Sequence, residues 1–553
     1  MNTNMFQICC KNNNKILNIN AGTTLYEAFK MLNFDMEYGP ISARMNNKSV
    51  GLDIPVFRPC TVEYLDMHNG SARRTYIRTL FCVLCKAVND LYPNSKVKIS
   101  FPVSNGYYCE VNIGREITDE DAAKILKRMQ EIKEAAIPVV HHEILTSELI
   151  KMFEEKGEMS KVKLLKTTGQ LYSVYYDIDG YIDDFYGSLL ENTSQLYLFN
   201  VVRYYEGLLL QVPMQNDPSK LGPMIHQDKM FNMFKLYHTR QERVHIDTVG
   251  DFNEVVDKGG ITQLVNVSEA LQEREISNIA EEIERRGDVR VVLISGPSSS
   301  GKTTTSKRLS VQLMASGINP ITISLDDYFV DREHTPRDEN GEYDYEHLHA
   351  LNIPLLNQHL KDLFEGKEVQ LPKYNFQTGK SVNGRKLQLK PSQILIMEGI
   401  HALNPELTAQ IPDNKKFKIY ASALTSILLD DHNYIPTTDN RLLRRIVRDY
   451  KYRGTSAKDT ISRWPSVRAG EDKWIFPFQE EADVMFNTAM IYEFSVLRQQ
   501  AVTVLEQVPQ NCEEYSEAYR LLKFLRNFRS IPSRDLPPTS LLREFLGGSS
   551  FKY

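Results

Sequence analysis

Hydrophobic and polar residues in the amino-terminal part of the chain alternate in short runs. Residues 1–66 predict short strands separated by turns, around one amphipathic segment at residues 23–32. We interpret this part as a small β-grasp unit. A helical period follows at residues 73–92, and extended stretches and further helical segments come after it. We therefore expect a second, α+β unit over residues 67–213.

The pattern changes in the second half of the chain. Residues 214–265 show no clear period, and we interpret residues 214–287 as a connecting region that ends in an amphipathic helix from Ser268 to a cap at Gly287. Apolar strands then alternate with helices, which is typical of a covered parallel sheet. These strands are 291–294, 321–325, 394–397 and 417–421. We predict an α/β domain over residues 288–490 and a helical tail at 491–553.

Composition narrows the classes of protein without selecting one. The 553 residues are 42% hydrophobic and 25% charged, as in ordinary globular proteins, and the net charge of −5 provides no general attraction to nucleic acid or membranes. No apolar run approaches the roughly 18 residues that span a bilayer. We expect a cytoplasmic protein without a membrane segment. The seven cysteines have no disulfide framework, and we interpret the pair Cys82 and Cys85 as buried helix residues rather than zinc or redox groups.

The strongest motif follows the first strand of the predicted parallel sheet. Residues 296–303 read Gly-Pro-Ser-Ser-Ser-Gly-Lys-Thr, a complete phosphate loop between a strand and a helix. Its backbone N–H groups can face an anion, while Lys302 adds a cation and Thr303 a hydroxyl for Mg²⁺. The motif predicts a nucleoside triphosphate site. The expected contacts are Gly296, Pro297, Ser298, Ser299, Ser300, Gly301, Lys302, Thr303 and Thr304.

Acidic residues follow two other strands of the same predicted sheet. Asp326 and Asp327 come after the second strand, and Glu398 ends the third. The carboxyl ends of parallel strands meet at the edge that also carries the phosphate loop. One acid there can accept a proton from an attacking hydroxyl and the other can hold Mg²⁺, as phosphoryl transfer requires. The alternative is that these acids only cap loops, which we prefer for Asp327.

A run of arginines lies at helical spacing further along the chain. Arg441, Arg444, Arg445 and Arg448 fall on one face of a predicted helix. Beside a phosphate loop, this face could stabilise a transferring phosphoryl group and close over ATP as a lid. A solvated helix face and a nucleic-acid-binding stripe are the alternatives. We assign Arg441 to catalysis, and Arg445 and Arg448 to the nucleotide.

These motifs together resemble the uridine kinase and phosphoribulokinase family of P-loop kinases. The resemblance covers residues 288–490 through the phosphate loop and the segments 324–329, 372–376, 397–400 and 438–449. It implies a kinase that uses ATP or GTP with Mg²⁺ to phosphorylate the 5′-hydroxyl of a ribonucleoside such as uridine or cytidine. It also implies that Asp326 is the general base and that Thr303, Asp326 and Glu398 surround Mg²⁺.

The same resemblance suggests how the acceptor nucleoside is held. It implies that Tyr374 packs on the base, that Arg441 holds substrate or phosphates, and that Tyr345 and Glu346 lie at the ribose hydroxyls. Two positions depart from the family pattern. Gly379 stands where uridine kinases carry a base-reading histidine, and Asn375 replaces an aspartate. Another nucleoside, or a sugar as in phosphoribulokinases, therefore stays open as the acceptor.

The amino-terminal half resembles a different family. Residues 1–66 look like a TGS domain, and residues 67–213 look like the editing domain of threonyl-tRNA synthetases, through segments 83–93, 105–108 and 182–187. The metal-site positions of that domain fall on Arg78, Cys82, Phe185 and Leu189. Since Phe and Leu cannot ligate a metal, we expect a degenerate site and a scaffold for binding or regulation.

The sequence gives weaker indications of binding partners other than a small-molecule nucleoside. The synthetase-like half could bind RNA, which leaves an RNA-binding regulatory NTPase as the alternative from another functional class. We also expect a homo-oligomer. The sequence assigns no role to the carboxyl-terminal residues 541–549.

Overall fold

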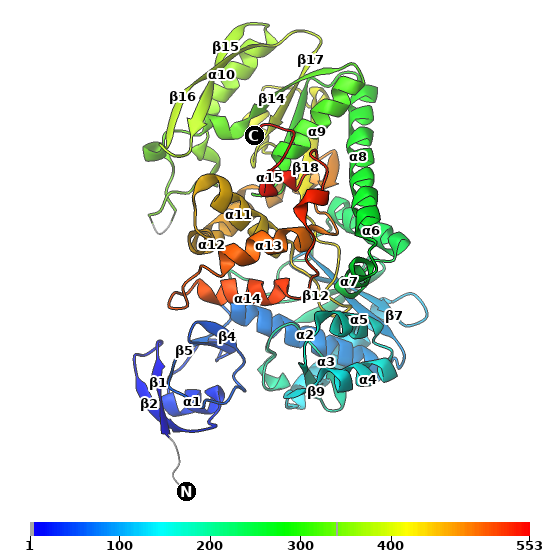
Figure 1. Cartoon of the computed structure of the whole chain (residues 1–553), viewed down its shortest axis with the longest axis vertical. Helices are drawn as coiled ribbons and strands as arrows, with labels where there is room; N and C mark the ends of the chain where they lie inside the picture. Colours follow the sequence, from blue (N-terminus) through cyan, green and yellow to red (C-terminus); the bar gives the residue numbers. More distant parts are fainter. Residues whose placement is uncertain (1–4, 339–340) are drawn as a thin grey trace.

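The computed structural model describes residues 5–338 and 341–553. A small amino-terminal sheet lies at one end of the molecule and a parallel sheet at the other, with helices between them (Figure 1). The C-terminus lies on the side of the parallel sheet rather than near the N-terminus. Among the described helices, none is long and apolar enough to cross a membrane.

The amino-terminal unit is a mixed sheet of five strands with one helix. Its strands are β1 (Met5–Cys10), β2 (Ile16–Asn20), β3 (Ser42–Met45), β4 (Lys48–Val50) and β5 (Cys60–Leu65), in the order β2-β1-β5-β3-β4. Only β1 and β5 pair in parallel. Helix α1 (Leu25–Leu32) begins with a capping box, because Thr24 and Glu27 exchange hydrogen bonds between side chain and backbone. The resemblance to a TGS domain stays a prediction.

The second unit contains two antiparallel sheets and a long buried helix. The helices are α2 (Gly70–Leu91), α3 (Asp119–Glu134), α4 (Thr146–Lys156) and α5 (Met159–Thr168). One sheet has the order β11 (Asn200–Tyr204), β12 (Gly207–Gln211), β7 (Gly106–Asn112), β6 (Lys96–Val103), and the other β10 (Tyr181–Asp183), β9 (Tyr172–Ile178), β8 (Val140–Leu145). Cys82 and Cys85 are buried thiols on α2, as the sequence predicts.

The connecting region has more regular structure than its sequence predicts. It contains α6 (Asp228–Val244) and α7 (Val249–Asp257), and α8 (Ile261–Arg286) begins before Ser268. In α6 the buried apolar residues all lie in the first two turns, so no helical period extends over the whole element. Gly287 ends α8 with a φ of 67°, as predicted for a glycine cap.

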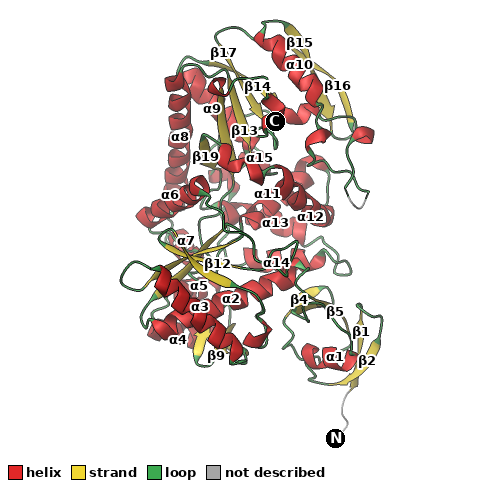
Figure 2. Cartoon of the chain, turned by 180° about the vertical axis from the view of Figure 1, so that it is seen from behind, coloured by secondary structure: helices red, strands yellow, loops and turns green. Residues whose placement is uncertain are grey.

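The parallel sheet has the order β14-β17-β13-β18-β19, and every neighbouring pair is parallel. Its strands are β13 (Val291–Ser295), β14 (Asn319–Ser324), β17 (Gln393–Glu398), β18 (Lys416–Ser422) and β19 (Val484–Asn487). The four predicted strands are therefore confirmed, while the short β19 was not predicted. Helices α8 and α9 (Lys302–Ala315) lie along the sheet, and α10 (Ile353–Phe364) accompanies the hairpin of β15 (Glu368–Asn375) and β16 (Lys380–Gln388) (Figure 2).

Helices from the last part of the chain join the two halves. These are α11 (Thr437–Arg453), α12 (Ala457–Trp474), α13 (Glu493–Leu505), α14 (Tyr515–Leu525) and the short α15 (Arg543–Leu546). The tail is helical as predicted, but it is not peripheral. Its apolar residues share one hydrophobic core with α5, α7, α8 and α11, so the carboxyl-terminal segment is part of the folded body.

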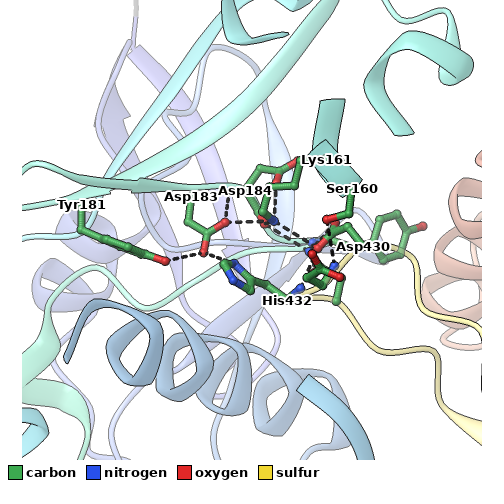
Figure 3. A network of polar contacts seen from close by, with 10 residues as sticks. Ser160, Lys161, Tyr181, Asp183, Asp184, Asp430 and His432 are labelled. Atoms are coloured by element: carbon green, nitrogen blue, oxygen red, sulfur yellow. Dashed lines mark hydrogen bonds and ion pairs between the residues drawn. The ribbon is translucent and has the colours of Figure 1, made fainter. Parts of the chain in front are cut away.

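A buried charge cluster also crosses between the two halves (Figure 3). The ammonium of Lys161 on α5 lies 2.9 Å from Asp183, 2.7 Å from Asp184 and 3.1 Å from Asp430, which belongs to the loop after β18. His432 of the same loop lies 2.7 Å from Asp183. Although burial opposes it, these carboxylates raise the pKa of Lys161 well above its usual value.

The ring of His432, the thiol of Cys85 and the carboxylate of Asp183 lie within 4.8 Å of one another, a spacing that a metal site would also have. Lys161 already neutralises this carboxylate, and a metal cation there would meet its positive charge. Burial raises the pKa of Asp183, but His432 and Lys161 outweigh it and lower that pKa overall. We interpret the cluster as a set of ion pairs that holds the halves together.

Candidate functional site

The phosphate loop connects β13 to α9 in a conformation that only glycine permits at two places. Gly296 has a φ of 153°, and a Cβ there would lie 1.9 Å from the carbonyl oxygen of Ala421 on β18. Gly301 has a φ of 83° and lies directly against Leu541. The loop therefore packs on the neighbouring strand and on the carboxyl-terminal segment, which fixes the direction of its N–H groups.

Lys302 is the first residue of α9, and its side chain bends back over the loop. Its Nζ donates to the carbonyl oxygen of Pro297 at 3.0 Å. Burial lowers the pKa of this lysine, while the carboxylates of Glu398 and Asp326 act in the opposite direction. A half-buried ammonium that is held beside phosphate-facing N–H groups is suited to bind the phosphates of a nucleotide.

The two predicted carboxylates meet at the carboxyl edge of the sheet. Ser324 of β14 and Ile294 of β13 both pair with Glu398 in β17, so the three strands end at one level beside the phosphate loop. Asp326 follows β14 by two residues. The hydroxyl of Thr303 donates to Glu398 at 3.4 Å. Burial, followed by the charge of Asp326, raises the pKa of Glu398 to about 7.

Asp327 makes a different contact from its neighbour. Its carboxylate forms an ion pair with Lys373 at 3.0 Å, which joins the loop after β14 to strand β15. Asp327 also belongs to the wall of the cleft, so the loop role that we preferred for it stays a prediction.

These residues line a cleft of about 1250 Å³ above the sheet edge. Ten basic and six acidic side chains line it, although the whole chain is acidic, so the cleft favours anionic ligands. Most of the predicted site residues belong to its wall. They are Ser298, Ser299, Ser300, Gly301, Lys302, Thr303, Asp326, Tyr345, Glu346, Tyr374, Glu398, Arg445 and Arg448. Gly296, Pro297, Thr304 and Arg441 are not part of the lining.

The arginines of α11 divide into two pairs. Arg441 and Arg444 are buried behind the phosphate loop, where they bind the carbonyl oxygens of Ser298 at 3.0 Å and Ser299 at 3.3 Å. Arg445 and Arg448 line the cleft, and Arg445 donates to the hydroxyl of Ser298 at 2.8 Å.

The first pair therefore supports the loop instead of facing the cleft, in contrast to the single cationic face that the spacing suggested. Apolar residues on the other side of α11 are buried as well. Only the face with Arg445 and Arg448 lines the cleft, while the rest of the middle of α11 is buried in the domain, which is unlike a helix that moves as a lid.

Buried acids that the sequence did not single out balance these arginines. Glu471 of α12 forms an ion pair with Arg441 and accepts from the backbone N–H of Ser298 at 3.1 Å. Glu493 of α13 binds Arg444, with an Nη2 to Oε2 distance of 2.8 Å. Each acid lies on a different helix from its arginine, and no motif surrounds it, so sequence spacing provides no signal for these pairs.

The predicted acceptor residues Tyr345, Glu346 and Tyr374 line the same cleft. Tyr374 is 4% exposed, and its ring packs against those of Phe329 and Phe376 at centroid distances of 5.5 and 5.0 Å. Burial raises the pKa of Glu346 to about 7, and Arg445 acts against this shift. Among the residues that the structure describes, Oε2 of Glu346 has no hydrogen-bond partner. A buried, unpaired carboxylate oxygen can accept a hydrogen bond from a ligand hydroxyl.

The two departures from the family pattern lie in the turn of the β15–β16 hairpin. Asn375 accepts hydrogen bonds from the N–H groups of residues 377 and 378, which is a turn role. Gly379 has a φ of 69°, and a Cβ there would lie 2.7 Å from Nε of Arg332. Arg332 lines the cleft and thus occupies the space beside Gly379.

A parallel sheet, a phosphate loop and two carboxylates at its carboxyl edge define a P-loop phosphotransferase domain. The profile of the Phosphoribulokinase / Uridine kinase family matches residues 291–492. Uridine kinases of Staphylococcus aureus, including those of strains JH9 and Newman, are 32% identical over 196 residues, which cover 35% of this chain and 86% of theirs. The chain therefore belongs to the phosphoribulokinase and uridine kinase family through this domain.

Solved structures show only a limited likeness. A possible uridine kinase from Bacillus stearothermophilus is 22% identical with a TM-score of 0.25, covering 36% of this chain and 89% of that one. The phosphoribulokinase from Rhodobacter spheroides is 16% identical with a TM-score of 0.27, covering 36% of this chain and 70% of that one.

Proposed function

We propose that this protein is an ATP-dependent nucleoside kinase that transfers the γ-phosphoryl group to the 5′-hydroxyl of a ribonucleoside such as uridine or cytidine. Membership of the family supports a nucleoside or sugar kinase. The observation that carries the finer proposal is the convergence of Lys302, Asp326, Glu346 and Tyr374 on the cleft that contains the phosphate loop.

Each group has a role that its position supports. The N–H groups of the phosphate loop and Lys302 hold the phosphates of ATP. Asp326 accepts the proton of the attacking 5′-hydroxyl. The donors Thr303, Asp326 and Glu398 are all hard oxygen ligands, which fit Mg²⁺. When bound there, Mg²⁺ supplies charge neutralisation to the phosphates. Arg445 and Arg448 add positive charge on the same wall.

The residues predicted to hold the acceptor suit a ribose and a flat base. Oε2 of Glu346 has no other partner in the described part of the chain and can accept from the ribose hydroxyls, and Tyr374 belongs with Phe329 and Phe376 to an aromatic cluster in the cleft wall on which a base can pack. Arg332 lies beside Gly379, and its guanidinium only donates hydrogen bonds. It therefore favours a substrate with hydrogen-bond acceptor atoms at this place, such as the carbonyl groups of a pyrimidine. The same guanidinium would also bind an anionic sugar, so a sugar kinase is the second candidate.

The experiment is a screen for ATP-dependent phosphorylation of purified full-length protein with nucleosides and sugars. We expect turnover with uridine or cytidine, strongly reduced turnover in Lys302→Ala and Asp326→Asn, and unchanged turnover in the exposed control Asp413→Asn. A preference for a sugar or sugar phosphate would favour the second candidate. ATP hydrolysis without any phosphorylated acceptor, together with salt-sensitive tRNA binding, would contradict the proposal and favour a regulatory NTPase.

The amino-terminal half is proposed as a binding or regulatory scaffold that resembles a TGS and a synthetase editing domain. The charge cluster around Lys161 supports a mechanical link between this half and the kinase domain, because Asp430 and His432 come from the loop after β18. RNA binding and assembly into a homo-oligomer also stay proposals for the full chain.

A further inference from the structure

The carboxyl-terminal segment, residues 541–553, lies against the phosphate loop. In Figure 1, α15 and the C-terminus are seen beside α9 and the parallel sheet. Seven residues of this segment belong to the wall of the cleft. They are Arg543, Glu544, Gly547, Gly548, Ser549, Phe551 and Tyr553. The segment follows the part of the chain that matches the kinase family, which ends at residue 492.

Buried contacts hold this segment in place. Leu541, Leu542 and Phe545 are fully buried in the core that contains α11 and α13. The guanidinium of Arg444 lies 5.0 Å from the centroid of the Phe545 ring, and Lys451 donates to the carbonyl oxygen of Leu546. Because the same Arg444 also binds the loop carbonyl of Ser299, the segment and the phosphate loop share one support.

Glu544 contacts α9 where a phosphate is expected to bind. Its Oε2 accepts from the hydroxyl of Thr304 at 2.6 Å and from the backbone N–H of Thr304 at 3.3 Å. The hydroxyl of Tyr553 lies 2.8 Å from the same Thr304 hydroxyl. Thr304 is in the first turn of α9, and backbone N–H groups of this turn are the ones that phosphate loops offer to nucleotide phosphates.

The charge of Glu544 also reaches the rest of the site. It acts to raise the pKa of both Lys302 and Glu398, so its carboxylate lies close to the groups that face the phosphates. A carboxylate fixed at this place repels a triphosphate and uses a donor that the triphosphate needs.

We propose that residues 541–553 are part of the nucleotide site and that Glu544 competes with a phosphate group of the bound nucleotide for the N-terminus of α9. The α9 turn is then released to the nucleotide only when the Glu544 side chain turns away, while the buried leucines keep the backbone of the segment in place. Glu544 thus sets the affinity for phosphorylated nucleotides. This inference rests on the proposed function only in taking a nucleotide as the ligand of the phosphate loop.

The test is calorimetric titration of the full-length wild type, Glu544→Gln and the control Glu506→Gln with ADP, ATP and adenosine. Glutamine keeps a side-chain acceptor for the N–H of Thr304 but removes the negative charge. Glu506 is an exposed residue at the end of α13, so its replacement changes the net charge by the same amount outside the cleft. Thermal unfolding of each variant shows whether the fold is retained.

We expect Glu544→Gln to bind ADP and ATP about tenfold more tightly than the wild type, which corresponds to about 1.4 kcal/mol. Adenosine, which has no phosphate, should bind both proteins equally, and Glu506→Gln should match the wild type. Equal or weaker binding of ADP by Glu544→Gln would overturn the inference and leave Glu544 as a helix cap only. Failure of the wild type to bind any nucleotide would instead contradict the proposed function.

Discussion

Replacing Lys161 by methionine tests whether the buried charge cluster holds the two halves of the protein together. The side chain of Lys161 is fully buried, and its ammonium lies within 3.1 Å of the carboxylates of Asp183, Asp184 and Asp430. Methionine fills a similar volume but leaves three carboxylates with His432 as their remaining cation. Removing one partner of a buried pair costs about 3–5 kcal/mol, so we expect the free energy of unfolding to fall by about this amount.

The assay is urea unfolding at pH 7.5, followed by far-ultraviolet circular dichroism. Lys163→Met is the matched control, because Lys163 lies on the same helix and pairs with Asp251 at 2.6 Å, but its side chain is 38% exposed. A pair whose cation is in contact with solvent in this way contributes about 0–1 kcal/mol. If Lys161→Met lowers the free energy of unfolding no more than Lys163→Met does, the interpretation that the cluster stabilises the contact between the two halves is refuted.

The pH dependence of the Lys161→Met variant provides a second check. Burial raises the pKa of Asp184 to about 6 in the wild type, even though Lys161 acts against this shift. Without Lys161 this pKa should rise further. A group whose pKa is raised on folding contributes stability below its unfolded pKa and loses it as the pH rises through the folded value. The difference in the free energy of unfolding between the wild type and the variant should therefore shrink when the pH is lowered from 7.5 to 5.5. A difference that grows would contradict this reasoning.

Three further predictions concern the kinase domain. Lys302→Ala should lower kcat by about 10²–10³ with little change in unfolding temperature, since it removes a charge that stabilises the transferring phosphoryl group; near-normal turnover would exclude the assigned role. Glu346→Gln should raise KM for the nucleoside about tenfold or more. In the wild type, that KM should rise as the pH falls below about 7, where Glu346 takes up a proton, and a flat profile would contradict its ribose contact. Glu493→Ala should destabilise the domain by about 3–5 kcal/mol because it leaves Arg444 buried without its carboxylate, and urea unfolding against the wild type measures this.

Local patterns predicted the centre of the site. The phosphate loop is a continuous segment whose strand, glycines and helix are all visible in the sequence, and parallel topology then brings Asp326 and Glu398 to the same edge. The three strands that carry these residues, and β18 beside them, could be predicted because each contains a short apolar run. Strand β19 contains an apolar run of only three residues, Val-Met-Phe, and therefore did not stand out.

Contacts between distant segments could not be predicted in the same way. The spacing of Arg441 and Arg444 indicated a cationic helix face, but the buried acids Glu471 and Glu493 on other helices draw these two arginines behind the loop. Glu544 reaches Thr304 across 240 residues of sequence, and no motif marks it. Such pairs depend on how helices pack, which a hydrophobic period does not specify.

The most direct test of the proposed kinase activity is phosphorus NMR of a reaction that contains the full-length protein, ATP, Mg²⁺ and uridine. The proposal predicts that ATP is converted to ADP in equal amount with a nucleoside monophosphate whose phosphoryl group is on the 5′-oxygen, and that Lys302→Ala forms neither product. Release of inorganic phosphate with no phosphorylated nucleoside, for uridine and for every other nucleoside tried, would contradict it.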